Sequence, residues 1–506
     1  MSLPGWLAPL YDAPRMRAID AWAIGRQGVP SIELMERAGA GLADAVASMA
    51  AESGRIVVIA GKGNNAGDGF VAARALRSAG RVVDVLAAGG LSGFSGDAAT
   101  NLERLGGAAP LPLEHGIAAD AVLVIDALLG TGASGAPRGE ILAAIEAIRA
   151  WGGPVLAADV PSGVDASSGE TEGLAVVASA TATFHAAKPG LWINPGRGCA
   201  GAVSVIDIGI PEGSPVEADV GLIEDSVLEQ IPPRTTHSTK FTSGRVLIVG
   251  GSPGLTGAPS LAVLAAARAG AGYVTACVPA SLSLIFETRL LEAMTLALPE
   301  ENGFHAPAGV APLLEAAAGR GSAFSALALG PGLGRGESAA AFVRAVLEGA
   351  QLPVVLDADG LNAFAGEIDS LRGRAAVLTP HEGELGRLLG GGGGRIAAAR
   401  LRCAREAAER AQAVVVLKGD DTLVADPDGR VAVNPGATPA LATAGTGDVL
   451  AGVTAAMLAK ELDPFTAACA AVRLHALAAI RAAAVHGAEG VIASDVIAEL
   501  GAVRRR

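Results

Sequence analysis

The chain has 506 residues and a mass of 49.9 kDa, which is too long for one ordinary domain and predicts two or three compact units. Hydrophobic residues make up 51% of it and glycine occurs 69 times, a composition that excludes a coiled coil, a collagen and a disordered protein. The formal net charge of -13 argues against general binding to nucleic acid or to an anionic membrane. We therefore expect small-molecule chemistry, in which local donors hold any bound anion.

The cysteine pattern and the apolar segments favour a cytoplasmic protein. The four cysteines stand far apart without a C-x-x-C pair, so neither a zinc site nor a disulfide framework is predicted. Residues 1–23 carry prolines and aspartates and lack the basic-then-apolar order of a secretory signal. The apolar stretch 465–485 is interrupted by Arg473, His475 and Arg481, which argues against a membrane span.

Two series of short Val- and Ile-rich runs alternate with Ala-rich segments of helical length, a pattern typical of parallel strands joined by crossover helices. The predicted strands are 55–59, 82–85, 121–125, 154–158 and 203–206 in the first series, and 245–249, 326–329, 353–356, 376–378 and 413–417 in the second. Residues 211–239 between them are rich in acids, lack a strong period and contain Pro232-Pro233. We predict an α/β protein with two domains, residues 1–225 and 226–506.

Three predicted strands of the first domain end in polar loops. These loops are Gly61-Lys-Gly-Asn-Asn-Ala-Gly-Asp-Gly-Phe70, Asp126-Ala-Leu-Leu-Gly-Thr-Gly132 and Asp159-Val-Pro-Ser-Gly163. In an open parallel sheet such loops lie along one edge, where ligands bind, and glycines let backbone N–H groups approach an anion. Each Asp by itself could simply cap the next helix, but three polar loops at one edge predict a binding site. Ala66 stands where the dinucleotide fingerprint has its third Gly, so that fingerprint is not matched.

Together with Arg15-Met-Arg-Ala-Ile-Asp20 and the segment 28–39, these loops resemble the NAD(P)H-hydrate epimerase domain, a Rossmann-like doubly wound sheet. The resemblance implies that the hydrate is bound by Asn64, Asn65, Ala66, Gly67, Asp68, Gly130, Thr131, Gly132, Ala133, Ser134, Gly135, Ala136 and Asp159. It also implies a potassium ion on Asn65, Asp126 and Ser162, whose oxygen atoms suit such a cation. Asp159 is the candidate acid/base for inverting the hydroxyl-bearing carbon. The family usually has Gly at the position of Ala66, whose methyl group would slightly crowd the phosphate side.

The strongest pattern of the second domain is Ala442-Thr-Ala-Gly-Thr-Gly-Asp448 immediately before a helix. Glycine and threonine at a helix start aim successive N–H groups at one point, which suits a transferring phosphoryl group, and Asp448 can take a proton there. A plain helix cap after a glycine turn is the alternative. Two further glycine-rich turns, 250–260 and 330–336, follow predicted strands and could be no more than tight turns.

With Pro353-Val-Val-Leu-Asp-Ala-Asp-Gly-Leu-Asn362 and Val416-Leu-Lys-Gly-Asp-Asp-Thr-Leu423, this pattern resembles the ribokinase-like superfamily. The form Pro380-His-Glu-Gly-Glu384 narrows the resemblance to ADP/ATP-dependent NAD(P)H-hydrate dehydratase, an α/β/α sandwich. It implies that the hydrate contacts Ala258, Gly332, His381 and Asp448, and that the adenine nucleotide contacts Lys418, Gly419, Asp420, Asp421, Thr422 and Gly447. Glu384 is a candidate organiser of Mg²⁺, with a surface helix residue as the alternative.

The function implied is repair of a nicotinamide nucleotide. Hydroxide is a poor leaving group, so transfer of a terminal phosphate from ADP or ATP to the ring hydroxyl would let it depart, with release of AMP or ADP and phosphate. The first domain would interconvert the R and S hydrates of NADH and NADPH, and the second would dehydrate the S form. The implied cofactors are K⁺ and Mg²⁺, and we expect a homo-oligomer. The alternative is a ribokinase-like small-molecule kinase with a nucleotide-binding, non-catalytic accessory domain.

Overall fold

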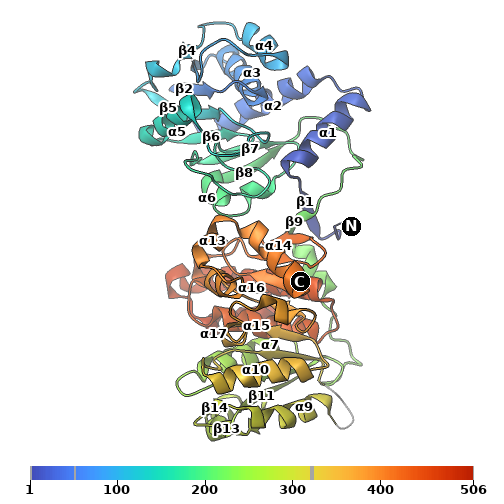
Figure 1. The fold of residues 1–506 in the computed structure, drawn as a ribbon. Helices are drawn as coiled ribbons and strands as arrows, with labels where there is room; N and C mark the ends of the chain where they lie inside the picture. The colour runs from blue at the N-terminus through green and yellow to red at the C-terminus, as the bar shows by residue number, and fades with distance from the viewer. Residues whose placement is uncertain (1–2, 51–52, 320–323, 505–506) are drawn as a thin grey trace. The chain divides into compact units, whose positions relative to one another are not determined.

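The computed structural model describes residues 3–50, 53–319 and 324–504. The chain divides into two compact units (Figure 1), one built mainly from residues 9–221 and one mainly from residues 222 onward together with residues 4–8. The predicted boundary at residue 225 stays a prediction.

A seven-stranded sheet forms the centre of the first unit, in the order β4-β3-β2-β5-β6-β7-β8, with every pair parallel. Its strands are β2 (Arg55–Ala60), β3 (Val82–Ala87), β4 (Leu111–Pro112), β5 (Ala121–Ala127), β6 (Val155–Ala158), β7 (Ala180–Phe184) and β8 (Ala202–Ile206). The helices are α1 (Ala13–Gly25), α2 (Ser31–Ala47), α3 (Asn64–Ser78), α4 (Gly96–Glu103), α5 (Gly139–Trp151) and α6 (Gly196–Ala200).

Apolar residues on both faces of this sheet explain the layers of helices. Successive side chains of a strand point to opposite faces, and in β2 Ile56 and Val58 join the core cluster shared with α1, α2 and α3. Val57 and Ile59 join the separate cluster shared with α5. A strand buried on both sides needs helices on both sides, so the doubly wound architecture predicted for this part is confirmed.

The main sheet of the second unit has the order β1-β9-β20-β19-β18-β17-β16-β15-β10-β11-β12. Pairing is parallel from β12 to β18 and antiparallel from β18 to β20. The strands are β1 (Leu7–Leu10), β9 (Val220–Ile223), β10 (Arg245–Val249), β11 (Tyr273–Pro279), β12 (Met294–Leu298), β15 (Ala326–Leu329), β16 (Val354–Leu356), β17 (Val377–Leu378), β18 (Val414–Leu417), β19 (Leu423–Ala425) and β20 (Val431–Val433), with a small hairpin of β13 (Glu300–Glu301) and β14 (Phe304–His305).

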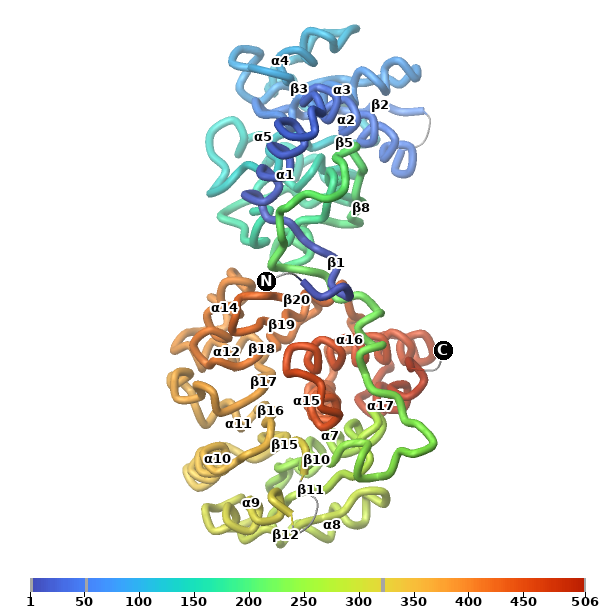
Figure 2. Tube along the Cα trace, turned by 90° about the vertical axis from the view of Figure 1, so that its right-hand side faces the viewer, coloured from blue at the N-terminus to red at the C-terminus, as the bar shows by residue number. Residues whose placement is uncertain are grey.

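Helices cover both faces of this sheet. They are α7 (Gly257–Arg268), α8 (Ser283–Arg289), α9 (Val310–Ala318), α10 (Glu337–Gly349), α11 (Asp359–Asn362), α12 (Glu382–Leu388), α13 (Gly393–Ala398), α14 (Arg400–Ala411), α15 (Thr446–Leu458), α16 (Pro464–His486) and α17 (Ala493–Val503). Figure 2 shows α7, α15, α16 and α17 on one side of the strands and α9, α10, α12 and α14 on the other, which confirms the predicted α/β/α sandwich. Among the helices of the described residues, only α16 has the length and apolar composition to cross a membrane, and most of it is buried in the structure.

All ten predicted strands are present within a few residues, and several strands were not predicted. β7 has the sequence Ala-Thr-Ala-Thr-Phe and β11 begins Tyr-Val-Thr-Ala-Cys, so neither shows the run of branched apolar residues that marked the others. Both are largely buried strands in which Ala and Thr interrupt the larger apolar residues. Their places in the sheets were therefore decided by packing rather than by a local pattern.

Candidate active sites

A cavity of about 900 Å³ opens at the carboxyl ends of β2, β5 and β6 in the first unit. Its polar lining includes Asn64, Asn65 and Asp68 from the start of α3, Gly130 to Ala133 after β5, and Asp159 after β6. The three polar loops predicted to converge therefore do so. The parallel pairing of β2, β5 and β6 brings their carboxyl ends, and so these loops, to one edge of the sheet.

Asp159 is the most heavily bonded side chain of this cavity. One carboxylate oxygen, Oδ1, lies 2.7 Å from Lys188 Nζ and accepts a hydrogen bond of 3.2 Å from Thr183 Oγ1. The other, Oδ2, accepts from both the backbone N–H, at 2.9 Å, and the hydroxyl of Thr131. The residue itself has φ 67°, a left-handed conformation that is strained for a side-chain-bearing residue and is seen at functional sites.

The carboxyl groups of the cavity are of two kinds, one with a lowered pKa and the others with raised pKa values. Burial tends to raise the pKa of Asp159, but the Lys188 ammonium and the Thr131 donors lower it overall, so this group is ionised. Burial raises the pKa of Asp68 well above its usual range, and the negative charges of Asp159 and Asp20 raise it further. Burial also raises the pKa of Asp20, which lines the same cavity.

Beneath the cavity, Asn65, Asp126 and Ser162 meet around Leu129. Asn65 Nδ2 donates to Leu129 O at 2.9 Å, while its buried Oδ1 has no hydrogen-bond partner. Ser162 donates to Asp126 through its hydroxyl at 2.7 Å and its N–H at 2.8 Å, and the Ser162 hydroxyl accepts from the Leu129 N–H at 3.0 Å. Burial raises the pKa of Asp126 to about 6. The Asn65 amide oxygen is therefore an unused oxygen ligand in a network that connects Asn65, through Leu129 and Ser162, to the buried Asp126 carboxylate.

The other residues predicted for the hydrate lie in several places. Ala66 is fully buried in the core cluster, and a Cβ atom on Gly67 would lie 2.5 Å from Met35 Sδ, so both could meet a ligand only through backbone atoms. Ser134 and Gly135 line a second, smaller cavity of about 190 Å³. Ala136 follows them in the same exposed loop. The binding roles of these residues stay predictions.

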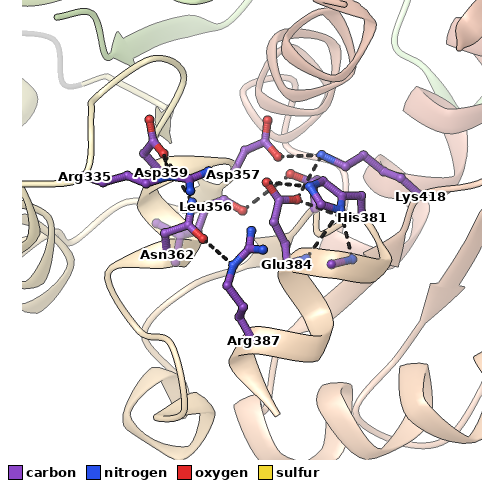
Figure 3. A network of polar contacts seen from close by, with 11 residues as sticks. Arg335, Leu356, Asp357, Asp359, Asn362, His381, Glu384, Arg387 and Lys418 are labelled. Atoms are coloured by element: carbon purple, nitrogen blue, oxygen red, sulfur yellow. Dashed lines mark hydrogen bonds and ion pairs between the residues drawn. The ribbon is translucent and has the colours of Figure 1, made fainter. Parts of the chain in front are cut away.

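Lys418 is the central cation of the polar cluster in the second unit (Figure 3). It follows β18, and its Nζ lies 2.9 Å from Asp357 Oδ1 and 3.6 Å from Glu384 Oε2. Asp357 directly follows β16, and its side chain is only 2% exposed. The two carboxylates raise the pKa of Lys418 against the effect of its burial. The lysine therefore stays charged.

His381 and Glu384 hold one another at the start of α12. His381 Nδ1 accepts from the backbone N–H of Gly383 at 3.0 Å, and Glu384 Oε2 accepts from the His381 N–H at 2.8 Å, which forms a capping box. The His381 side chain is 55% exposed, whereas that of Glu384 is 7% exposed. Glu384 is thus a buried member of the Lys418 cluster and not a surface helix residue, and His381 caps its helix with the rest of its ring accessible.

Asp448 lies in the first turn of α15, the most buried helix of this unit. Burial raises its pKa to about 7, and the negative charges of Asp357 and Glu384 contribute to the rise, while Lys418 opposes it. A Cβ atom on Gly447 would lie 3.5 Å from Lys418 Nζ. The lysine therefore reaches the N-terminal end of α15, where the helix dipole favours an anion.

The remaining predicted residues of this unit border the same edge of the sheet. Gly332 has φ 63°, and a Cβ atom on it would lie 3.3 Å from the Ala258 Cβ, so the two predicted hydrate contacts are neighbours. The turn after Lys418 is closed by Thr422, whose Oγ1 accepts from the Gly419 N–H at 3.1 Å and donates to the Gly419 O at 2.6 Å. Asp420 and Asp421 lie within that turn, with Asp421 buried.

Comparison with known proteins gives relatives over nearly the full length. Residues 246–501 match the family described as NAD(P)H-hydrate dehydratase, and residues 31–190 match the family described as YjeF-related protein N-terminus. A protein of Moorella thermoacetica named bifunctional NAD(P)H-hydrate repair enzyme Nnr is 40% identical over 96% of this chain and 95% of its own length. The chain belongs to the family of bifunctional NAD(P)H-hydrate repair enzymes.

A second relative of the same name agrees. The protein of the same name from Salinibacter ruber is 40% identical over 97% of this chain and 95% of its own length. A crystal structure of an ADP/ATP-dependent NAD(P)H-hydrate dehydratase from Bacillus subtilis, co-crystallised with ATP and Mg²⁺, is 32% identical, covers 55% of this chain and 94% of that one, and superposes with a TM-score of 0.47. The resemblances predicted for both halves are confirmed, and the repair enzyme is favoured over a kinase with an accessory domain.

Two residues at the centre of these sites had no predicted role. Lys188, the partner of Asp159, follows β7, and nothing in the sequence Lys-Pro-Gly marks it as buried. Asp357 stands inside a quoted motif, and the pair of acids in Asp357-Ala-Asp359 at a strand end was the signal that could have selected it.

Proposed function

We propose that this repair enzyme interconverts the R and S hydrates of NADH and NADPH in the first unit and dehydrates the S form in the second, with ADP or ATP as co-substrate. The observation that carries the proposal is the pair of sites themselves. One is a cavity with an ionised, firmly held Asp159. The other is a lysine–carboxylate cluster at the N-terminal end of a buried helix. Stereochemical inversion needs the first kind of site, and phosphoryl transfer needs the second.

In the first unit, the cavity suits a dinucleotide hydrate. Its volume of about 900 Å³ is at the upper end for ligand pockets. Arg17, Lys62 and Arg138 also line it, at exposed positions. We assign these three cations to the phosphate groups of the substrate. Asp159 then serves as acid/base at the hydroxyl-bearing ring carbon.

Asn65, Asp126 and Ser162 fit the predicted potassium ion. Asn65 Oδ1 is buried without a partner, and Asp126 receives donors from Ser162 and Leu128 but no cation contact within the described residues. When bound, the ion would supply a positive charge that ties the Asn65 helix start to the Asp126 and Ser162 loops. These residues therefore hold the floor of the cavity in place for the substrate.

In the second unit, Lys418 and the N-terminal N–H groups of α15 would hold the terminal phosphate of the nucleotide. Asp448 takes the proton of the substrate hydroxyl as that oxygen attacks phosphorus. AMP or ADP departs as the P–O bond to the nucleotide breaks. The lone pair of the ring nitrogen then expels the phosphorylated oxygen as phosphate and forms a C=N⁺ bond. Loss of the proton on the adjacent ring carbon to phosphate or solvent restores the dihydronicotinamide. Gly332 and Ala258 border the space for the hydrate, and the Lys418 to Thr422 turn borders the space for the adenine nucleotide.

Mg²⁺ fits this site as a companion of the nucleotide. Asp357, Asp359, Glu384 and Asp448 place an excess of negative charge around one lysine. Among the residues that the structure describes, no three His, Cys, Asp or Glu side chains form a preformed metal centre. The ion would therefore bind through nucleotide phosphates and one or two carboxylates, and it would neutralise charge developing on the phosphoryl group. We further propose a cytoplasmic homo-oligomer.

The test supplies each purified hydrate epimer to the full-length enzyme with KCl, MgCl₂ and either ADP or ATP. We expect the absorbance of reduced nicotinamide to recover from both epimers, with stoichiometric inorganic phosphate. A stable phosphorylated substrate without recovery would favour a kinase and overturn the dehydratase. Recovery from the S epimer alone, at the rate of uncatalysed epimerisation for the R form, would overturn the epimerase.

A further inference from the structure

A second carboxyl group shares the epimerase cavity with Asp159. Asp68, in the first turns of α3, lines the cavity and is 8% exposed, as is Asp159. The negative charge of Asp159 acts on the Asp68 carboxyl. Burial of a carboxyl group without a hydrogen-bond partner costs folding free energy, so such a group in a substrate cavity indicates a function there.

The charges around the two carboxyl groups differ in sign: those around Asp159 are mainly positive, and those around Asp68 are mainly negative. Asp159 receives a lysine ammonium, two threonine hydroxyls and two backbone N–H groups. Within the described residues, no hydrogen bond or ion pair engages the Asp68 carboxyl. The charged groups that act on it are Asp159 from the β6 loop, Asp20 from α1 and, more weakly, Lys188 from the loop after β7. Two carboxyl groups whose environments push their proton affinities apart are the usual arrangement of a general acid with a general base.

We propose that Asp68 is the general acid that works with Asp159 as general base in the epimerisation. This role rests on the epimerase function proposed above. Asp68 in its neutral form donates its proton to the substrate hydroxyl, the C–O bond breaks, and the hydroxyl leaves as water while the ring-nitrogen lone pair forms a C=N⁺ bond. A second water then attacks the same carbon from the opposite face.

Asp159 completes the inversion. Its carboxylate accepts a proton from the attacking water as the new C–O bond forms and the electron pair returns to nitrogen. One water leaves, one water enters, and one proton has moved from Asp68 to Asp159, from which it returns through solvent. In the opposite direction the two groups exchange roles, so one pair serves both epimers.

Asp20 is the alternative candidate for the general acid. It also lines the cavity, and it also has a raised pKa, with burial as the main cause. It is only partly buried, however, and lies on α1 rather than beside the Asn64–Asn65 helix start. A partly hydrated carboxyl holds its proton less firmly, which favours Asp68.

The experiment follows epimer interconversion by chromatography in ¹⁸O-water, without adenine nucleotide, with a no-enzyme blank. We expect the wild-type enzyme to incorporate one solvent oxygen per inversion. D68N should lower kcat about 100-fold or more with KM within about twofold, and it should remove the alkaline limb of the pH profile. D68E, which keeps an acid, should restore part of kcat. D44N, which removes an exposed carboxylate of α2 outside the cavity lining, is the matched control and should stay within about twofold of wild type.

Each outcome decides one question. Inversion by the wild type without ¹⁸O incorporation would show that the hydroxyl never leaves and would overturn the acid step while the epimerase function stands. An alkaline limb that persists in D68N but disappears in D20N would overturn the choice of Asp68. Absence of any inversion above the blank in the wild type would overturn the epimerase function itself. The ¹⁸O measurement uses the wild type, so it stays decisive even where a variant folds poorly.

Discussion

Lys188 and Asp159 form an ion pair of 2.7 Å in which the lysine side chain is 1% exposed and the aspartate side chain 12% exposed. Thr183 Oγ1 and the Phe184 carbonyl oxygen, each 2.8 Å from Nζ, complete the surroundings of the ammonium group. A charge this deeply buried is stable only with its partner in place. The pair therefore links the stability of the first unit to the protonation state of Asp159, the residue proposed as its acid/base.

Replacement of Lys188 by Met should destabilise the first unit by about 3–5 kcal/mol, because it leaves Asp159 buried without its counter-ion. The folded-state pKa of Asp159 is lowered from 3.8, so the stability it contributes is present above that value and is lost as the pH falls through the folded pKa. The deficit of the variant in urea unfolding should accordingly be largest near neutral pH and shrink in acid. An equal deficit at all pH values would contradict this account. Lys62→Met, at an exposed lysine, is the control and should change stability by less than about 0.5 kcal/mol.

The Asp448→Asn variant should lose dehydration about 100-fold or more while it retains epimerisation. Only the ionised form of Asp448 can accept the hydroxyl proton, and its pKa is raised to about 7, so wild-type kcat/KM at low Mg²⁺ should rise with pH through that value. Added Mg²⁺ should move the rise to lower pH. Because a raised carboxyl pKa means that the folded state binds the proton more tightly, wild-type stability should fall as Asp448 ionises, and that fall should be absent from the variant. A pH profile unchanged by the substitution would exclude Asp448 as the base.

Removal of the Asp126 carboxylate should abolish the response to potassium. KCl should raise the melting temperature of the wild type relative to tetramethylammonium chloride at equal ionic strength, because an ion bound only by the folded state stabilises it. Asp126→Asn should melt at the same temperature in both salts. A potassium response that survives both this substitution and Asn65→Ala would place the ion elsewhere.

Two glycine positions in the second unit should respond in opposite ways to alanine. A Cβ atom on Gly447 would meet only Lys418 Nζ, at 3.5 Å, so Gly447→Ala should fold normally, with stability unchanged or up to about 1 kcal/mol higher. Its methyl group should nevertheless crowd the phosphate and raise the KM for the nucleotide about tenfold. A Cβ atom on Gly330, at φ 133°, would lie 1.8 Å from the Asp357 carbonyl oxygen, so Gly330→Ala should unfold the second unit. Normal nucleotide KM in the Gly447 variant would contradict phosphate binding at the start of α15.

Much of both sites was predictable because the decisive patterns are local. A Val- and Ile-rich run followed by a polar glycine turn indicates the end of a parallel strand, and parallel strands bring all such ends to one edge. Asn65, Asp126 and Asp159 needed no more than that rule to be grouped, and Lys418 and Asp448 were grouped by the same rule together with the family resemblance.

The tertiary structure alone decided which groups act on one another. Lys188 reaches Asp159 because β7, a strand of small residues that no pattern marked, lies next to β6. Asp448 owes its raised pKa to burial and to Asp357 and Glu384, which stand 91 and 64 positions earlier in the chain. Hydrophobic periodicity is a property of neighbours in sequence, and amino-acid order determines it directly. Desolvation and Coulomb interaction depend on burial and on distances in space. The pKa of each acidic side chain, and with it the role proposed for that residue, is therefore set only by the folded structure.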